Sequence, residues 1–167
     1  MTAAPAEPRI RPATPADTAL IVALIRELAE YEKLAHEAVA DEVGLAAQLF
    51  GPTPRAEVLI AEVGGTPAGF ALFFHNFSTF VGKPGLYLED LFVRPAFRGL
   101  GLGKRLMVRL AQIAVERDCG RFEWSVLDWN TPAIDFYRSL GAVGMDDWTV
   151  QRVSGEALRA LATRADD

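Results

Sequence analysis

The sequence contains a single cysteine, Cys119, and no apolar run of the length that spans a lipid bilayer. One cysteine cannot form an intrachain disulfide, which excludes a disulfide-stapled secreted fold and is typical of proteins of the reducing cytoplasm. The first residues also lack a basic start followed by an apolar stretch, so we expect no secretory signal. These absences predict a cytoplasmic protein that has no membrane-spanning segment.

Histidine and positive charge are also scarce. His36 and His75 have no metal-ligand spacing to each other or to Cys119, so we expect no metal site. The 17 Lys and Arg residues are outnumbered by 22 Asp and Glu residues, which gives a formal net charge of −5. Because nucleic-acid-binding domains are usually basic, we expect no nucleic-acid partner. Cys119 ends a predicted helix with no histidine nearby in sequence, which is typical of an inert thiol and not of a nucleophile.

Apolar residues, by contrast, make up 50% of the 167 residues, enough for one sizeable core. We expect residues 1–8 to be a disordered lead and residues 9–167 to form a single domain. Capping residues and apolar periodicity predict helices at residues 15–34, 41–50, 102–118, 131–140 and 155–162, with Thr14 and Thr131 as N-caps of the first and fourth. Alternation predicts strands at residues 9–12, 57–63, 68–77, 85–93, 121–127 and 147–153. This order implies an α/β fold with a mixed sheet and helices on its faces.

A glycine-rich turn joins the apolar strand "YLEDLFV" to a helix, in the stretch "VRPAFRGLGLGKRL" at residues 93–106. Free N–H groups at a helix start favour an anion, and glycine lets the backbone approach it closely. The P-loop motif fails because Arg105 stands where a hydroxyl is needed, and the dinucleotide motif fails on glycine spacing. The pattern is instead Arg98-x-x-Gly101-x-Gly103. The alternative interpretation is a plain tight turn before a packed helix.

The stretch "YLEDLFVRPAFRGLGLGKRL", followed in order by "VLDWNTPAIDFYRSLGA", resembles the GNAT family of N-acetyltransferases. Together with "IRPATPADTALIVALIRELAEYEKL" and the closing "GEALRALA", it resembles the branch that contains the diamine (spermidine/spermine) and thialysine acetyltransferases. The resemblance implies a mixed, mostly antiparallel central sheet, splayed between two parallel strands, with helices on both faces. It also implies acetyl-CoA as cosubstrate, a small-molecule primary amine as substrate, and a homodimer.

The resemblance assigns the cofactor to the turn, to the strand before it and to the region after the splayed strands. The turn would hold the pyrophosphate, and the backbone of Leu91 and Val93 would pair with the pantetheine arm. Asn130 and Tyr137 would lie near the thioester. The cofactor residues implied in this way are Leu91, Phe92, Val93, Arg98, Gly99, Leu100, Gly101, Gly103, Lys104, Asn130 and Tyr137.

Acetyl transfer to an amine needs a proton acceptor and a proton donor, because a lysine-like amine with a pKa of about 10.4 arrives protonated and a thiolate must leave. Glu89 matches the family's base, and its alternative role is a structural acid that only holds an ammonium. Tyr137 matches the family's acid, and its alternative role is a packed core aromatic. Asp90 should point away from Glu89 on a regular strand, yet the resemblance places it near the amine, which would suit a β-bulge.

The identity of the amine is less determined by the sequence. Glu30, Tyr31 and Glu32 end the first long helix, where acids could hold a second ammonium or form only a solvated helix end. We take Glu30, Tyr31, Glu89, Asp90 and Trp129 as the candidate substrate residues, with Trp129 contacting a cation through its ring or simply packing.

The chain also departs from the polyamine-specific members, which carry an acid, a proline and a tryptophan before "GK". Ser78-Thr79-Phe80 lie there instead. This favours thialysine, lysine-like amino acids or short diamines over long polyamines. Acetylation of a protein N-terminus or a drug amine, and a CoA-binding module without catalysis, are the alternative functions.

Overall fold

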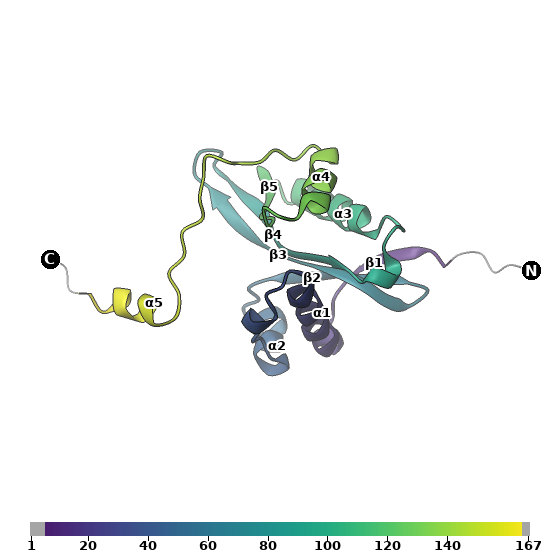
Figure 1. Ribbon diagram of the computed structural model, residues 1–167, viewed down its shortest axis with the longest axis horizontal. Coiled ribbons are helices and arrows are strands. Elements are labelled where there is room, and N and C mark those ends of the chain that lie inside the picture. The colour runs from purple at the N-terminus through teal and green to yellow at the C-terminus, as the bar shows by residue number, and fades with distance from the viewer. Residues whose placement is uncertain (1–5, 165–167) are drawn as a thin grey trace, which may run out of the picture. The chain divides into compact units, whose positions relative to one another are not determined.

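The computed structural model describes residues 6–164 and has a five-stranded sheet in the order β1-β2-β3-β4-β5 (Figure 1). The contacts divide the chain into two compact units at the boundary between Ser125 and Val126. The first unit contains β1 Pro8–Pro12, α1 Thr18–Tyr31, α2 Glu42–Phe50, β2 Glu57–Val63, β3 Thr66–Ser78, β4 Lys83–Val93, α3 Leu102–Glu116 and β5 Arg121–Trp124, with short 3₁₀ turns η1 Pro15–Asp17, η2 Ala35–Glu37 and η3 Pro95–Phe97. The second contains α4 Thr131–Ser139 and α5 Gly155–Ala162.

The sheet is antiparallel from β1 to β4 and parallel only between β4 and β5. Gly64 and Gly65 form the β2–β3 turn with positive φ values of 59° and 78°, as a tight hairpin requires. Helices α1 and α2 cover one face of the sheet, and α3 covers the other (Figure 1). The expected mixed sheet with helices on both faces is therefore confirmed.

The core between α1, α2 and the sheet holds the buried side chains of Ile21, Leu24, Ile60, Phe70 and Phe92, among others. Burying a side chain of this size contributes about 1.5–3 kcal/mol to folding. On the other face, α3 buries the residues spaced three or four apart that its amphipathic pattern predicted, which include Leu102, Leu106 and Leu110. Packed helices thus anchor both faces of the sheet.

Helix α1 is fixed to the end of β4 by one forked ion pair. Arg94 donates from Nε and Nη2 to the two carboxylate oxygens of Glu27 at 3.0 and 2.8 Å, and from Nη1 to the Pro67 carbonyl at 3.1 Å. Two parallel hydrogen bonds to a carboxylate restrict both distance and orientation. The C-terminal part of α1 is therefore fixed against the end of β4, the strand that carries several of the candidate site residues.

Two sequence expectations in the second unit were wrong. No strand forms at residues 147–153, which have no ladder partner among the described residues, although their alternation is typical of a strand. The N-cap of α4 is Asn130 and not Thr131, because the Asn130 Oδ1 accepts the Ala133 amide at 3.3 Å. The helix at residues 155–162 is confirmed as α5.

The expected lead is described only from residue 6, since residues 1–5 lie outside the described part of the chain. Pro8, which we assigned to the lead, already belongs to β1. The single domain over residues 9–167 stays a prediction.

Candidate active site

Strand β4 has one edge that is only half covered. Its residues 85–88 pair with β5 at residues 121–124, whereas among residues 6–164 the sheet places only β3 beside residues 89–93. The parallel pairing stops at Leu88 and Trp124, where β5 ends, so the sheet is open at this edge as the fold class predicted. Backbone groups that point away from β3 in this half of β4 are therefore available to a ligand.

The register shows which groups these are. The Arg94 amide donates to the Ala68 carbonyl at 2.8 Å, so the pair next to it, Val93 and Gly69, does not exchange hydrogen bonds. The N–H and C=O of Val93 consequently point away from β3, and the alternation places those of Leu91 on the same side. Phe92 differs, since its backbone faces β3 and its side chain is buried in the core.

The glycine-rich turn adopts the left-handed conformations that its composition favours. Gly99 and Gly101 have φ values of 83° and 74°, and a Cβ at either position would meet nothing within 4 Å. Helix α3 begins at Leu102, and the Arg105 amide donates to the Gly101 carbonyl at 3.0 Å. The amides before Arg105 in the first turn therefore have no carbonyl within the helix. This turn is open to an approaching anion.

The other turn residues surround these amides. Leu100 and Lys104 are exposed, and Gly103 lies in the first turn of α3. Lys104 and Gly101 line a cavity of about 470 Å³ between α3 and β1, together with Arg105. Positive charge and free amides thus occur at the same helix start.

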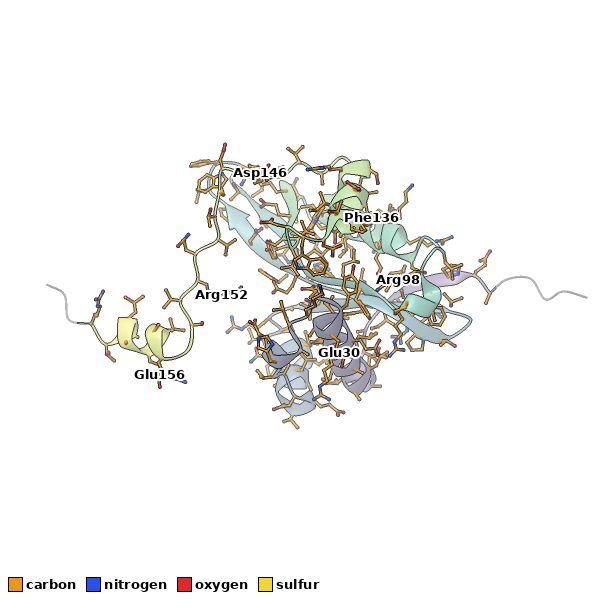
Figure 2. The ribbon with its side chains drawn as sticks, in the orientation of Figure 1. Glu30, Arg98, Phe136, Asp146, Arg152 and Glu156 are labelled. Atoms are coloured by element: carbon orange, nitrogen blue, oxygen red, sulfur yellow. The ribbon has the colours of Figure 1, made fainter. Side chains whose placement is uncertain are left out.

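The side chain of Arg98 is exposed, but contacts within the first unit hold it in one position. Its Nε donates to the Val93 carbonyl at 3.1 Å. Its guanidinium carbon lies 5.0 Å from the centre of the Tyr31 ring and 6.0 Å from that of Phe92. Figure 2 labels Arg98 on the turn and Glu30 near the end of α1. The side chain therefore joins the turn to the end of α1.

A β-bulge lies at the acidic pair of β4. Leu88 pairs with Phe73 and Asp90 pairs with Leu72, so Glu89 is an extra residue without its own partner on β3. Glu89 is exposed and Asp90 is half-buried. The bulge that Asp90 required is confirmed, and it removes the strict alternation that would separate the two carboxylates.

Electrostatics connect three carboxylates at this point. Burial raises the pKa of Asp90 to about 7, with further contributions from the negative charges of Glu89 and Glu32. Burial and the charge of Glu89 also raise the pKa of Glu32. We call Glu32, Glu89 and Asp90 the acid cluster. A cation placed among them would relieve their mutual repulsion.

Of the acids at the end of α1, Glu32 belongs to the acid cluster and Glu30 is exposed. Glu32 follows buried Leu28 by four residues, so it lies on the face of α1 that is directed toward the sheet. This helical spacing is the signal that would have selected Glu32 over Glu30 from the sequence. Tyr31, the last residue of α1, carries the ring that the Arg98 guanidinium contacts.

The remaining candidates belong to the second unit. Asn130 is buried and caps α4, which begins at Thr131 with Pro132 in its first turn. Tyr137 is half-buried on α4, its ring centre 5.4 Å from that of Phe136, and Trp129 is exposed. The roles of these residues toward the cofactor and the amine stay predictions.

Two classes of site are not found in residues 6–164. No group of three His, Cys, Asp or Glu residues in this part of the chain is arranged to hold a metal ion. None of the helices within it is long and apolar enough to cross a membrane.

Comparison with known proteins agrees with this arrangement. The family model described as "Acetyltransferase (GNAT) family" matches residues 22–142. Thialysine N-epsilon-acetyltransferase of Bos taurus is 39% identical over 164 residues, covering 92% of this chain and 96% of that protein. L-ornithine N5-acetyltransferase of Arabidopsis thaliana is 35% identical, covering 92% of this chain and 87% of that protein.

A solved structure supports the fold independently. The integron cassette protein from the mobile metagenome of V. cholerae superposes with a TM-score of 0.80 at 30% identity, covering 94% of this chain and 98% of that one. The family model spans the acid cluster, the open edge of β4 and the glycine-rich turn. The chain therefore belongs to the GNAT acetyltransferase family and is an acyltransferase enzyme.

Proposed function

We propose that the protein transfers an acetyl group from acetyl-CoA to a primary amine of a small molecule, by direct attack in a ternary complex. One arrangement carries this proposal. The open edge of β4 has an anion-binding turn at one end and a cluster of carboxylates at the other. An extended ligand with a diphosphate would be directed along that edge toward a site that attracts an ammonium.

The residues present fit acetyl-CoA on two observations. The free first-turn amides of α3 and the Lys104 side chain suit a diphosphate, and the outward-facing backbone of Leu91 and Val93 suits the amides of a pantetheine arm. When bound, the thioester supplies an activated acetyl group. The turn and strand residues hold this cosubstrate in place, and the resemblance to the family adds Asn130 to them.

The acid cluster binds and deprotonates the amine. Glu89 accepts the proton that the substrate ammonium must lose, directly or through a water, and Asp90 anchors the ammonium. A pKa of about 7 keeps Asp90 only partly ionised at neutral pH, so a bound cation increases its ionisation. Tyr137 donates a proton to the departing thiolate. The amine nitrogen forms the new amide bond while the carbon–sulfur bond breaks.

The substrate proposed first is thialysine or a similar lysine-like amino acid, followed by short diamines. The relatives from Bos taurus and Arabidopsis thaliana act on thialysine and on L-ornithine according to their names. The acid cluster suits amines that carry a second positive charge. We also propose a cytoplasmic homodimer with no nucleic-acid or membrane partner, and light scattering that gives the mass of a monomer at micromolar concentration would contradict the dimer.

A thiol-release assay with acetyl-CoA tests the function. Thialysine, lysine, ornithine, diamines and polyamines form the panel, and mass spectrometry identifies the acetylated product. We expect release with thialysine and ornithine and weak release with long polyamines. Failure of every small amine would favour a peptide N-terminus or a drug amine. CoA binding without thiol release with any amine would favour a non-catalytic binding module.

A tyrosine pair tests the proton donor. Tyr137→Phe should lower turnover about 100-fold, within the range of general acid catalysis, while acetyl-CoA affinity stays within about twofold. Tyr87→Phe is the matched control, because the Tyr87 hydroxyl contacts the Ser125 hydroxyl at 3.0 Å and has no role in the proposed chemistry. Equal turnover in the two variants would remove Tyr137 from the mechanism.

A further inference from the structure

The Val93 carbonyl, which points into the open edge of β4, already accepts a hydrogen bond in this structure. Its donor is the Nε of Arg98, at 3.1 Å. Under the proposed function, the same carbonyl is an acceptor for the pantetheine arm. Arg98 therefore occupies a position on β4 that the cosubstrate needs.

The other contacts of Arg98 hold it there. Its guanidinium carbon lies 5.0 Å from the centre of the Tyr31 ring and 6.0 Å from the centre of the Phe92 ring. The Tyr31 and Phe92 rings are 6.5 Å apart and tilted by 49°, so they form a two-sided aromatic support. A cation on an aromatic face is attracted by the ring quadrupole. Figure 2 shows the labelled Arg98 on the turn before α3.

We propose that Arg98 changes partners when the cosubstrate binds, leaving the Val93 carbonyl and the Tyr31 ring for the diphosphate. This inference rests on the proposed function. Tyr31 is then a positioning residue: it stabilises the free-state position of Arg98 and so weakens CoA binding.

The chain permits such a change. Arg98 has extended backbone angles, φ −70° and ψ 154°, and a Cβ placed on the next residue, Gly99, would meet nothing within 4 Å. Arg98 is exposed, so its movement requires no rearrangement of the backbone and removes only its contacts with the Val93 carbonyl and with the Tyr31 and Phe92 rings. A guanidinium makes paired, charge-assisted hydrogen bonds to phosphate oxygens, which are stronger than a single bond to a neutral carbonyl. The diphosphate therefore competes effectively for Arg98.

Calorimetric titration with CoA, in the absence of any amine, tests the exchange with two variants of Tyr31. Tyr31→Leu removes the ring and should lower the Kd for CoA about two- to fivefold, the range expected for an exposed cation–π contact. Tyr31→Phe keeps the ring and is the matched control, with a Kd within about twofold of the wild type. An unchanged or higher Kd in Tyr31→Leu would overturn the exchange.

A measurement on the wild type does not depend on the folding of a variant. The Arg98 Nε–H resonance, assigned by its absence in Arg98→Lys, should shift on addition of CoA because its acceptor and its neighbouring ring change. A resonance that stays in place at saturating CoA would overturn the exchange and leave the proposed function intact. A wild type that binds no CoA would overturn both.

Discussion

The two halves of β4 belong to one continuous strand and have different surroundings in the sheet. Residues 85–88 lie between β3 and β5, and Leu86 and Leu88 are fully buried. Residues 89–93 have one strand beside them and carry the acidic pair and the outward-facing backbone of Leu91 and Val93. The bulge at Glu89 separates the halves. A single strand thus contributes to stability at one end and to the site at the other.

The comparison shows that the candidate site depends on the lack of a strand beside residues 89–93 as much as on its side chains. A fifth strand extending beyond Trp124 would satisfy the β4 backbone and remove the open edge. The short β5 leaves these groups available for a ligand. The two halves of β4 can be compared by their amide exchange rates, by the loss of stability on substitution and by the pH dependence of stability.

The largest expected difference is in amide hydrogen exchange. Residues 85–88 have a paired strand on each side, β3 and β5. Their amides should therefore exchange only by global or large-scale unfolding. The amides of Leu91 and Val93 face the open edge and should exchange at least about 1,000-fold faster in the free protein, since their opening requires no disruption of the sheet. Exchange measured residue by residue by NMR would refute the two-halves description if the rates matched.

The next difference is in the free energy of unfolding. Leu88→Ala should cost about 3 kcal/mol because it leaves a cavity in a fully buried position. Leu91→Ala, at a half-buried position, should cost about 1 kcal/mol. Urea denaturation of both variants measures the pair. Equal losses would show that the open half is packed as tightly as the paired half.

The third difference, similar in size to the second, is the pH dependence that Asp90 imposes. Its pKa of about 7 in the folded protein exceeds the ordinary value of 3.8, so the folded state binds more protons between these limits and stability falls as the pH rises toward 7. The stability of Asp90→Asn relative to the wild type should therefore rise by about 2–3 kcal/mol between about pH 5 and about pH 8, and its advantage should fade as the pH approaches about 4. Denaturation curves at about pH 5 and about pH 8 measure this change across the window that linkage defines.

The exposed Asp128 provides the control for that experiment. Asp128→Asn should leave the difference in stability between the acidic and the alkaline measurement as in the wild type. If Asp90→Asn behaves in the same way, neither burial nor the neighbouring carboxylates raise the pKa of Asp90, and the acid cluster is not an electrostatic unit.

Much of the fold was predictable because local signals and packing agree. The alternating strand at residues 57–63, the Gly64-Gly65 turn and the helix expected at residues 41–50 all form as predicted, the last as α2. The segment at residues 147–153 shows the limit of such signals. Alternation predicts a strand only where another strand offers hydrogen bonds, and Trp148 and Val150 of this segment are exposed. The sequence shows the alternation of residues 147–153, but it does not show whether another strand lies beside them.

The site was predictable to a different degree. The glycine-rich turn depends on local backbone conformations, which Gly99 and Gly101 specify directly. The acid cluster depends on a bulge and on the face of a helix, so Glu32 could be found only by placing it on the face of Leu28. The contact between Arg98 and Tyr31 joins residues far apart in sequence, and no local pattern indicates it.

The fork between Arg94 and Glu27 has a consequence for how such an enzyme can diverge. It sets the rotational phase of α1 only a few residues before Tyr31 and Glu32. One residue inserted between Glu27 and Glu32 would turn the later carboxylate by about 100° around the helix axis, out of reach of Asp90. Under the proposed function, new amine preferences can therefore arise by exchanging side chains at the end of α1, whereas insertions and deletions there would abolish recognition before they disturbed the fold.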